Sequence, residues 1–427
     1  MEIKIWNTLS ESQKQDALTR PAQASSQKVQ EIVSNIISRI RKEGDNALFE
    51  FSKTLDKFEG ENLQWSQSEI EAACARVDDE LKAAIDTAYV NIKKFHEAQE
   101  PHHVQLETFP GIVCQTHTHP IDSVGLYVPG GSAPLVSTAL MLAVPAAIAG
   151  CPEVILCSPP PISDAIIYAA TKAGVKKIFN LGGAQAVAAM AYGTQTVPKV
   201  LKIFGPGNQF VTMAKRLVSN DPYGAAIDMP AGPSEVLVIA DDKANPAFVA
   251  ADLLSQAEHG PDSQVILVTQ SSDFAKKAMD EVNVQLEALP RKEIAIKALS
   301  KSTAIVTDNL EEAAKVSNTY APEHLILQVS DPEPLLPKLR NAGSIFVGAY
   351  TPESLGDYAS GTNHTLPTYG YAKTCCALGT DDYRRRYTIQ KASKEGLLAI
   401  AKTVTTLAAA EGLDAHKNAV VVRVKDL

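Results

Sequence analysis

Gln256 and His259 lie three residues apart in the segment DLLSQAEHGPDSQ, at residues 252–264, and their types suit a shared ligand. The Asn-Pro pair at 245–246 predicts the start of a helix with an apolar stripe, and the Gly-Pro pair at 260–261 predicts its end. Gln256 continues that stripe, so His259 is expected to project from the last turn on nearly the same side. Two alternatives stay open: these groups satisfy each other and nearby backbone, or they bind one ligand together.

Four of the nine histidines share a pattern, because each is expected at the end of an element or in a polar segment and has a carboxylate or amide close in sequence. The four pairs are His259 with Glu258, His324 with Glu323, His364 with Asn363, and His416 with Asp414. Zinc accepts imidazole and carboxylate ligands, and a catalytic zinc site keeps positions open for water or substrate. The spacing is no compact metal motif such as HExxH, so a shared metal and separate capping or surface histidines both stay open.

Glu323 and His324 are adjacent and follow Pro322 at the start of an expected apolar strand. Neighbouring side chains of a strand point to opposite faces, but at the mouth of a strand both can reach one pocket. A carboxylate and an imidazole there can serve as two separate proton acceptors. A polar pair in solvent at the strand end is the alternative.

Glycines gather where strands are expected to end. The segments are VPGGSAP at 128–134, LGGAQA at 181–186 and FGPGNQ at 204–209. In an open parallel sheet ligands bind beyond the carboxyl ends of the strands, where glycine lets backbone N–H groups approach a phosphate. None of the three is a GxGxxG motif, so a dinucleotide site and ordinary tight turns are both compatible with them.

The elements that must position these groups alternate between strands and helices. Residues 1–100 have helical periodicity, whereas short β-rich runs alternate with helical stretches from about residue 121 and again from EVLVIA at 235–240. This rhythm predicts an α/β fold of two tandem Rossmann-like units, each with an incomplete parallel sheet, and a helical N-terminal region. A helix from residue 392 and the tail after it are too short for their own core, so we expect this small helical tail to pack on a partner subunit.

The size and charge of the chain narrow the class of partner. Its 427 residues exceed the roughly 250 to 300 residues at which single cores stop growing. The 40 basic and 49 acidic residues give a net charge of −9 without a long basic run. This balance disfavours nucleic acid and anionic membranes as partners and favours a small molecule.

Targeting signals and cysteine spacing indicate the compartment. The weakly polar stretch at 133–149 is broken by Ser, Thr and Pro and falls short of the roughly 20 residues of a membrane span. The N-terminus has neither a basic n-region nor an apolar h-region. Six cysteines without CxxC or disulfide-like spacing suit a reducing compartment. We therefore expect a cytoplasmic enzyme without a membrane partner.

Eight segments follow one another along the chain as GLYVPGGSAPL, GGAQA, KIFGPGNQFV, AIDMPAGPSEVLVIAD, LLSQAEHGPDSQVIL, APEHLI, GDYASGTNHTLPTYGYA and LDAHKNAV. In this order they resemble the signature segments of the histidinol dehydrogenase family, over essentially the whole chain and with no departure at a functional position. The resemblance implies an NAD-dependent, four-electron oxidation of L-histidinol to L-histidine through a bound aldehyde, which completes histidine biosynthesis. It also implies an intertwined homodimer with one zinc ion per subunit and active sites shared between subunits.

The resemblance further implies which residues bind the metal, the substrate and the cofactor. The implied zinc ligands are Gln256, His259, Asp357 and, from the other subunit, His416. These four also contact the substrate, together with Ser234, His324 and Glu411. The implied NAD contacts are Tyr127, Gln185 and Asn208, and His364 has only a supporting role. An amide oxygen, two imidazoles and a carboxylate leave coordination positions for a substrate that carries an imidazole and an amine.

Two residues carry the proton transfers that the family's reaction implies. His324 would take the hydroxyl proton as hydride leaves for NAD. Glu323 would then activate the water that hydrates the aldehyde, and His324 would act again as the hydrate gives up a second hydride to a second NAD. The metal would orient the substrate rather than activate a water.

We expect four parts along the chain. They are an N-terminal arm at 1–22, an α/β domain at 23–120 plus 236–380 with most of the catalytic and metal residues, an α/β domain at 121–235 that binds NAD, and a dimer-crossing tail at 381–427. The active site is then expected to combine the second part of one subunit with the tail of the other.

Three other functions are weighed against this one. Oxidation through a cysteine thiohemiacetal needs an activated thiol, and neither Cys114 nor Cys151 lies in an activating sequence context. A zinc hydrolase would use Glu323 as the base for a bound water and would turn over without NAD. A non-catalytic nucleotide-binding protein would bind NAD or metal without needing the Glu323–His324 pair.

Overall fold

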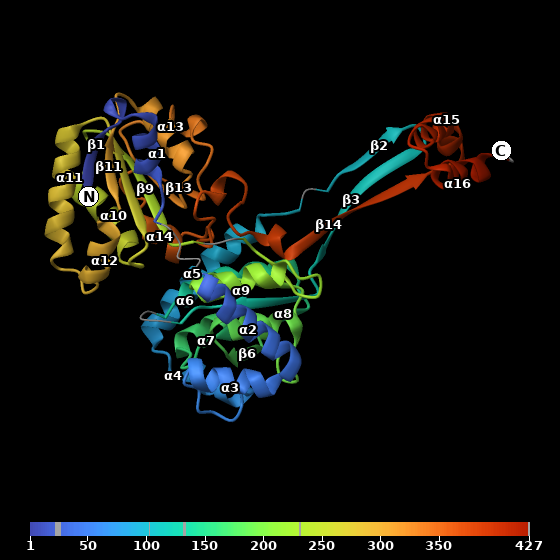
Figure 1. The fold of residues 1–427 in the computed structure, drawn as a ribbon, viewed down its shortest axis with the longest axis horizontal. Coiled ribbons are helices and arrows are strands. Elements are labelled where there is room, and N and C mark those ends of the chain that lie inside the picture. The colour runs from blue at the N-terminus through green and yellow to red at the C-terminus, as the bar shows by residue number, and fades with distance from the viewer. Residues whose placement is uncertain (22–26, 102, 131–133, 230–231, 426–427) are drawn as a thin grey trace.

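The computed structural model describes residues 1–21, 27–101, 103–130, 134–229 and 232–425. Figure 1 shows two α/β lobes and a long arm that projects away from both. None of the helices within these ranges is long and apolar enough to cross a membrane. The prediction of an α/β fold with two parallel-sheet units is confirmed.

The first lobe contains a parallel sheet of five strands. Their spatial order is β6 (Lys177–Asn180), β5 (Glu153–Ser158), β4 (Ser123–Tyr127), β7 (Lys202–Phe204) and β8 (Ala226–Ile227). Counted along the chain this is the order 3-2-1-4-5, which doubly wound α/β sheets share. The order reverses between β4 and β7, so the loops after these two strands meet at the topological switch point.

Helices cover both faces of this sheet. The crossover helices are α6 (Val136–Ala149), α7 (Asp164–Lys172), α8 (Gly183–Tyr192) and α9 (Gln209–Ser219). One core joins α8 and α9 to α2 (Gln27–Glu43) and α3 (Asp45–Leu55), and the other joins α6 and α7 to α4 (Gln67–Arg76) and α5 (Asp79–Glu97). The N-terminal helices therefore pack on the sheet of 121–235, whereas the sequence grouped them with 236–380. Their apolar stripes are buried against α6 to α9, which supply the complementary surface.

The second lobe repeats the strand order of the first. Its parallel strands lie in the order β1 (Glu2–Ile5), β11 (Thr303–Val306), β10 (Gln264–Thr269), β9 (Glu235–Ala240), β12 (His324–Gln328) and β13 (Ser344–Val347). Strand β1 adds an edge strand from the N-terminus. The strands β9, β10 and β12 are buried on both faces, as expected of a sheet with helices on each side.

The helices of the second lobe are α1 (Glu11–Leu18), α10 (Pro246–Ala257), α11 (Ser272–Leu286), α12 (Lys292–Leu299), α13 (Leu310–Tyr320) and α14 (Glu353–Tyr358). They connect these strands or, as α1 and α14 do, lie between this sheet and other parts of the chain. Short 3-10 turns occur at Trp6–Thr8, Leu336–Lys338, Tyr371–Lys373 and Thr380–Tyr383. Helices α10, α11 and α12 share one core with the sheet, and α13 lies in the core on the opposite face.

The arm combines two parts of the chain that lie far apart in sequence. Strands β2 (Gln105–Phe109), β3 (Ile112–Pro120) and β14 (Arg384–Ala392) form an antiparallel sheet, and α15 (Lys394–Ala410) and α16 (Asp414–Val424) lie at its far end (Figure 1). The predicted tail at 381–427 thus includes a strand and pairs with residues 112–120, which the sequence had placed in an α/β domain. Among the described arm residues, the buried apolar side chains are only Ala401 and Ala408.

Candidate active site

A cavity of about 160 Å³ lies where the two lobes meet. The first lobe lines it at the carboxyl ends of its strands, through Thr138, Gly205, Lys215 and Asp228. The second lobe lines it at the starts of β9 and β12, at the end of α10 and in α14 after β13. The residues are Ser234, Glu323, His324, Gln256, His259 and Asp357. The cavity therefore lies at the carboxyl ends of the strands in the first lobe, where ligand binding was expected, but at the amino ends of the strands in the second lobe.

Glu323 and His324 lie at the start of β12, and both line this cavity. The Oε2 atom of Glu323 lies 3.6 Å from Nδ1 of His324. Only 7% of Glu323 and 3% of His324 are exposed, so the alternative of a solvated polar pair does not hold. Because β12 begins at His324, the residue before it is free of the strand's alternation and turns into the same cavity.

Buried charge shifts the protonation of both groups. Burial raises the pKa of Glu323 to about 8. Burial alone would lower the pKa of His324, but the carboxylates of Glu353, Glu323 and Asp357 outweigh it and hold that pKa well above its ordinary value. Burial also raises the pKa of Glu353 to about 8. The cavity thus concentrates carboxylates around one imidazole, and their mutual repulsion favours a bound cation.

The imidazole of His324 has partners for two protonation states. Nδ1 lies 2.9 Å from the Gln256 amide nitrogen, which donates to the neutral ring. The same nitrogen lies 3.2 Å from the Glu235 carbonyl, which accepts when the ring is protonated. On the other side, Nε2 lies 3.4 Å from Oδ1 of Asp357 but has no hydrogen-bond partner among the described residues. A ring that finds a partner in either state is suited to gain and lose a proton.

Gln256 is positioned by helix α10. Asn245 caps this helix by accepting from the amide of Ala247, and Pro246 is its first residue, as predicted. The helix ends at Ala257, so His259 lies two residues beyond it rather than in its last turn. Nε2 of Gln256 donates to Glu235 O at 3.1 Å, and the buried Oε1 has no hydrogen-bond partner among the described residues. The side-chain amide of Gln256 is therefore held by its nitrogen, and its oxygen is available to a ligand.

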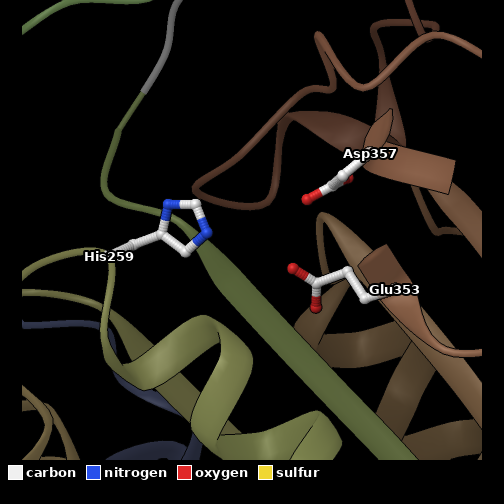
Figure 2. Close-up of side chains that lie close together, drawn as sticks. All are labelled: His259, Glu353 and Asp357. Atoms are coloured by element: carbon white, nitrogen blue, oxygen red, sulfur yellow. The ribbon is translucent and has the colours of Figure 1, made fainter. Parts of the chain in front are cut away.

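His259, Glu353 and Asp357 bring nitrogen and oxygen donors to within 4.8 Å of one another (Figure 2). Helix α14 carries Glu353 and Asp357 one turn apart, so both carboxylates point the same way. Oε2 of Glu353 is buried without a hydrogen-bond partner in the described part of the chain, as is the Gln256 oxygen. An amide oxygen, an imidazole and carboxylates are zinc donors. The residues present therefore fit a divalent cation such as zinc.

Three of the four histidines that share the sequence pattern reach this cavity. His259, His324 and His364 all line it, and Nε2 of His364 is buried without a hydrogen-bond partner among the described groups. His416 does not line it, because it lies exposed in α16 at the far end of the arm. Glu411 follows α15 in the same region and is also exposed. Within one chain, the two arm residues are therefore separated from the other predicted site residues (Figure 1).

The three expected cofactor contacts lie at the carboxyl edge of the first sheet. Tyr127 ends β4, and its buried hydroxyl accepts from the Gly183 amide at 3.0 Å. Gln185 is buried in the first turn of α8 and donates to Asp56 at 3.0 Å. Asn208 caps α9 with its own side chain. The structure thus groups these residues near the switch point, although none of them lines the cavity described above.

An ion pair that no sequence motif indicated fixes the loop after β7. Lys215 Nζ donates to Gly205 O at 2.7 Å and to Asp228 Oδ1, while Asp228 Oδ2 accepts from Gly205 N at 2.7 Å. Gly205 has φ +122°, and a Cβ there would lie 2.0 Å from Tyr127 O. The pair therefore clamps this glycine against β4 at the switch point. No local signal marks the pair, because its members are 13 residues apart.

The sequence motifs also did not indicate Glu353, although it lies four residues before Asp357. Residues four apart on a helix share a face, so a predicted helix through GDY would have indicated it. The obstacle is that α14 has only six residues, within a segment rich in Gly, Ser, Thr and Pro.

The cysteines give no support to a thiol mechanism. All six are free, and none of them is among the described residues that line the cavity. Burial raises the pKa of Cys151 to about 11, and burial also raises that of Cys157. A nucleophilic thiol needs a lowered pKa, so these two are the opposite of activated.

Comparisons with known proteins agree along the whole chain. The sequence model of the family described as histidinol dehydrogenase matches residues 18–424. Histidinol dehydrogenases from Campylobacter jejuni (strain RM1221) and Vibrio parahaemolyticus are 57% and 56% identical over 427 residues, covering 100% of this chain and 100% and 99% of their own lengths. The crystal structure of histidinol dehydrogenase from Elizabethkingia anophelis has a TM-score of 0.96 and 48% identity, and the match covers 100% of this chain and 98% of that one.

Proposed function

Because this chain belongs to the histidinol dehydrogenase family, we propose that the cavity between its two lobes is where histidinol is oxidised. The family makes the protein an NAD-dependent oxidoreductase of histidine biosynthesis. The observation that carries the proposal is the buried pair of Glu323 and His324, which opens into the same cavity as the zinc-donor cluster.

We assign the first oxidation to His324. L-histidinol loses a hydride from its carbinol carbon to NAD and its hydroxyl proton to the imidazole, and the products are the bound aldehyde and NADH. The partners of Nδ1 support this role, since the ring stays hydrogen-bonded through that nitrogen before and after it takes the proton.

We assign the second oxidation to Glu323 and His324 together. Glu323 accepts a proton from water as the oxygen of that water adds to the aldehyde carbon, and His324 returns its proton to the aldehyde oxygen, which forms the hydrate. His324, now deprotonated again, takes a hydroxyl proton of the hydrate as a second hydride leaves for a second NAD. The resulting carboxylic acid releases its proton to water, and the product is the carboxylate of L-histidine. The cavity holds both acceptors side by side, so one bound intermediate can reach both.

We propose that Gln256, His259 and Asp357 hold one zinc ion per subunit, together with His416 of a second copy of the chain. The unpartnered Gln256 oxygen and the clustered donors of His259 and Asp357 support this set. When bound, the ion would supply positive charge that orients the amine and imidazole of the substrate. Ser234 and Glu411 would add substrate contacts, and Tyr127, Gln185 and Asn208 would contact NAD.

We propose that the arm exchanges between two chains of a homodimer. Its tip exposes large apolar side chains but has almost no buried core of its own; these side chains are Leu398, Val404, Leu407, Leu413, Val421 and Val422. A surface of this kind needs a partner. Exchange would bring Glu411 and His416 to the other chain's cavity, where a fourth metal ligand is needed. We also place the enzyme in the cytoplasm, because six free cysteines suit a reducing compartment.

Hybrid dimers test the shared site. A Glu323→Gln chain and a His416→Ala chain are each expected to be nearly inactive in steady-state oxidation of histidinol when expressed alone. If each site combines two chains, one of the two sites in a hybrid dimer has both wild-type residues. Random pairing makes about half of the dimers hybrids, so co-expressed chains should recover about a quarter of the wild-type activity. The control is a chain that carries both substitutions and is expressed alone, because its dimers contain no site with both wild-type residues. No recovery in isolated hybrid dimers would mean that the site lies within one chain.

The reaction itself is tested by counting NADH per histidinol consumed, before and after chelation and zinc restoration. Two NADH for each histidinol, lost with the metal and regained with zinc, is the expected result. NADH formation that persists in fully metal-free protein would contradict the role given to zinc.

A further inference from the structure

The peptide groups of Glu235 hold three side chains of the proposed active site. Its N–H donates to Oε2 of Glu323 at 2.9 Å. Its carbonyl accepts from Nε2 of Gln256 at 3.1 Å and lies 3.2 Å from Nδ1 of His324. One residue at the start of β9 thus sets the positions of both proton acceptors and of the amide expected to bind zinc.

The side chain of Glu235 is fixed in turn by Arg20. The guanidinium forms a two-pronged ion pair, with Nε 2.5 Å from Oε1 and Nη2 2.9 Å from Oε2. The Tyr369 amide donates to the same carboxylate at 2.8 Å. The side chains of Glu235 and Arg20 are only 2% and 13% exposed. A forked pair shielded from water keeps its geometry better than an exposed one.

Arg20 also braces the turn that leads to the two proton acceptors. Its Nη2 donates to the carbonyls of Tyr320 at 2.8 Å and Ala321 at 3.2 Å, and the guanidinium lies 4.0 Å from the centre of the Tyr320 ring. Ala321 has φ +55°, a conformation that is costly for alanine and needs external support. Glu323 follows two residues later. One guanidinium therefore restrains both strand starts, at β9 and at β12.

The N-terminal segment delivers Arg20 to this place. Strand β1 pairs with β11, Thr19 O accepts from Gln264 at 3.1 Å, and Pro21 O accepts from the Tyr369 hydroxyl at 2.7 Å. The residues on either side of Arg20 are thus anchored to the second lobe.

We propose that Arg20 and Glu235 form a positioning ion pair for Glu323, His324 and Gln256, which makes the N-terminal segment a working part of the active site. This inference rests on the proposed function of those three residues. Neither member of the pair lines the cavity, so both act through the Glu235 peptide and the turn at 320–323. Loss of the pair should displace the acceptors and the amide together, and it should spare NAD binding in the first lobe.

Arg20→Met, Arg20→Lys and Glu235→Gln test the proposal, with Arg76→Met as the matched control. Arg76 forms a comparable forked pair with Asp164 at 2.6 and 2.7 Å in the first lobe. We expect Arg20→Met to lower kcat on histidinol and on histidinaldehyde by about 10- to 100-fold, since small misplacements of catalytic groups cost that much. KM for NAD should stay unchanged. Arg20→Lys keeps a charge but not the fork, so it should recover only part of the loss.

Zinc retention provides a readout besides activity. Metal loss to a competing chelator should be faster in Arg20→Met than in wild type or Arg76→Met, because the Gln256 amide loses its orientation. Wild-type kcat and wild-type zinc retention in folded Arg20→Met would overturn the proposal. If that variant does not fold, Glu235→Gln decides instead, because it preserves the shape and the acceptor for Tyr369 N–H.

Two reference variants separate this proposal from the proposed function. Glu323→Gln and His324→Ala should each lose activity on at least one substrate. If both keep wild-type activity, the assigned chemistry fails, and the positioning role fails with it. If they lose activity while the Arg20 and Glu235 variants match wild type, only the positioning role is overturned.

Discussion

His324 and Asp357 are in direct contact, with Nε2 of the imidazole 3.4 Å from Oδ1 of the carboxylate. On its other side the same ring faces Glu323 at 3.6 Å and Glu353 at 4.0 Å. The proposed proton acceptor and the proposed metal site therefore form one electrostatic unit. Ionising all three acidic groups around one buried imidazole would leave excess negative charge, which a divalent cation would offset.

Glu323→Gln should separate the two oxidations. The amide cannot accept the proton of water, so oxidation of supplied histidinaldehyde should fall about 100-fold. The first NADH formed from histidinol in a single turnover should fall much less, because His324 takes that proton. The exposed change Glu333→Gln serves as the control. Equal loss in both oxidations would show that the two roles are wrongly divided.

Glu353→Gln should weaken metal binding. Its carboxylate lies in the donor cluster with His259 and Asp357, and the neutral amide removes one negative charge from it. Groups that support metal ligands typically contribute 10- to 100-fold in affinity, so we expect about a tenfold loss of zinc affinity. Titration of metal-free protein against a chelator of known affinity measures this. Asp357→Asn should lower the zinc affinity more than Glu353→Gln does. A larger loss in Glu353→Gln would show that Glu353, not Asp357, is the tighter ligand.

Asp252→Asn should stabilise the protein at neutral and alkaline pH. Burial raises the pKa of Asp252 to about 6, only partly opposed by the hydrogen bond from Gln328. The carboxylate is more acidic when unfolded, so the wild type loses stability as pH rises from near 4 through 6. Above that range the variant should be more stable by on the order of 2 kcal/mol, and below it the two should converge.

Denaturant unfolding of metal-free protein at a series of pH values measures this difference. The fully exposed change Asp79→Asn is the control. A variant that is less stable than wild type at pH 8 would show that the Asp252 carboxylate is stabilising.

Gly205→Ala should disturb the cofactor side of the cavity. A Cβ at this position would lie 2.0 Å from Tyr127 O, so the β7–α9 loop must move away from β4. We expect a raised KM for NAD and a loss of about 2 to 4 kcal/mol in the free energy of unfolding. Gly174→Ala is matched, because Gly174 has φ +95° in the same lobe with no atom within 4 Å of its Cβ. Equal effects would mean that backbone strain alone, not the clash, is responsible.

Local features of the active site could be predicted because their causes are local. The cap at Asn245, the proline after it and the Gly-Pro pair after His259 define α10 through hydrogen bonds and backbone restrictions within a few residues. The alternation of buried strands with helices likewise indicated two parallel sheets. The adjacency of Glu323 and His324 required no folding to be seen.

The sequence by itself therefore determined the α/β class, the family and most of the proposed site residues, since periodicity and motifs lie within short stretches. Only the tertiary structure decided that residues 27–97 pack on the first sheet, that the second lobe uses the amino ends of its strands, and that Arg20 braces Glu235. The physical reason is that an apolar stripe or a charged side chain encodes the need for a partner but not which partner. That choice depends on the shape and charge of surfaces that distant segments form together.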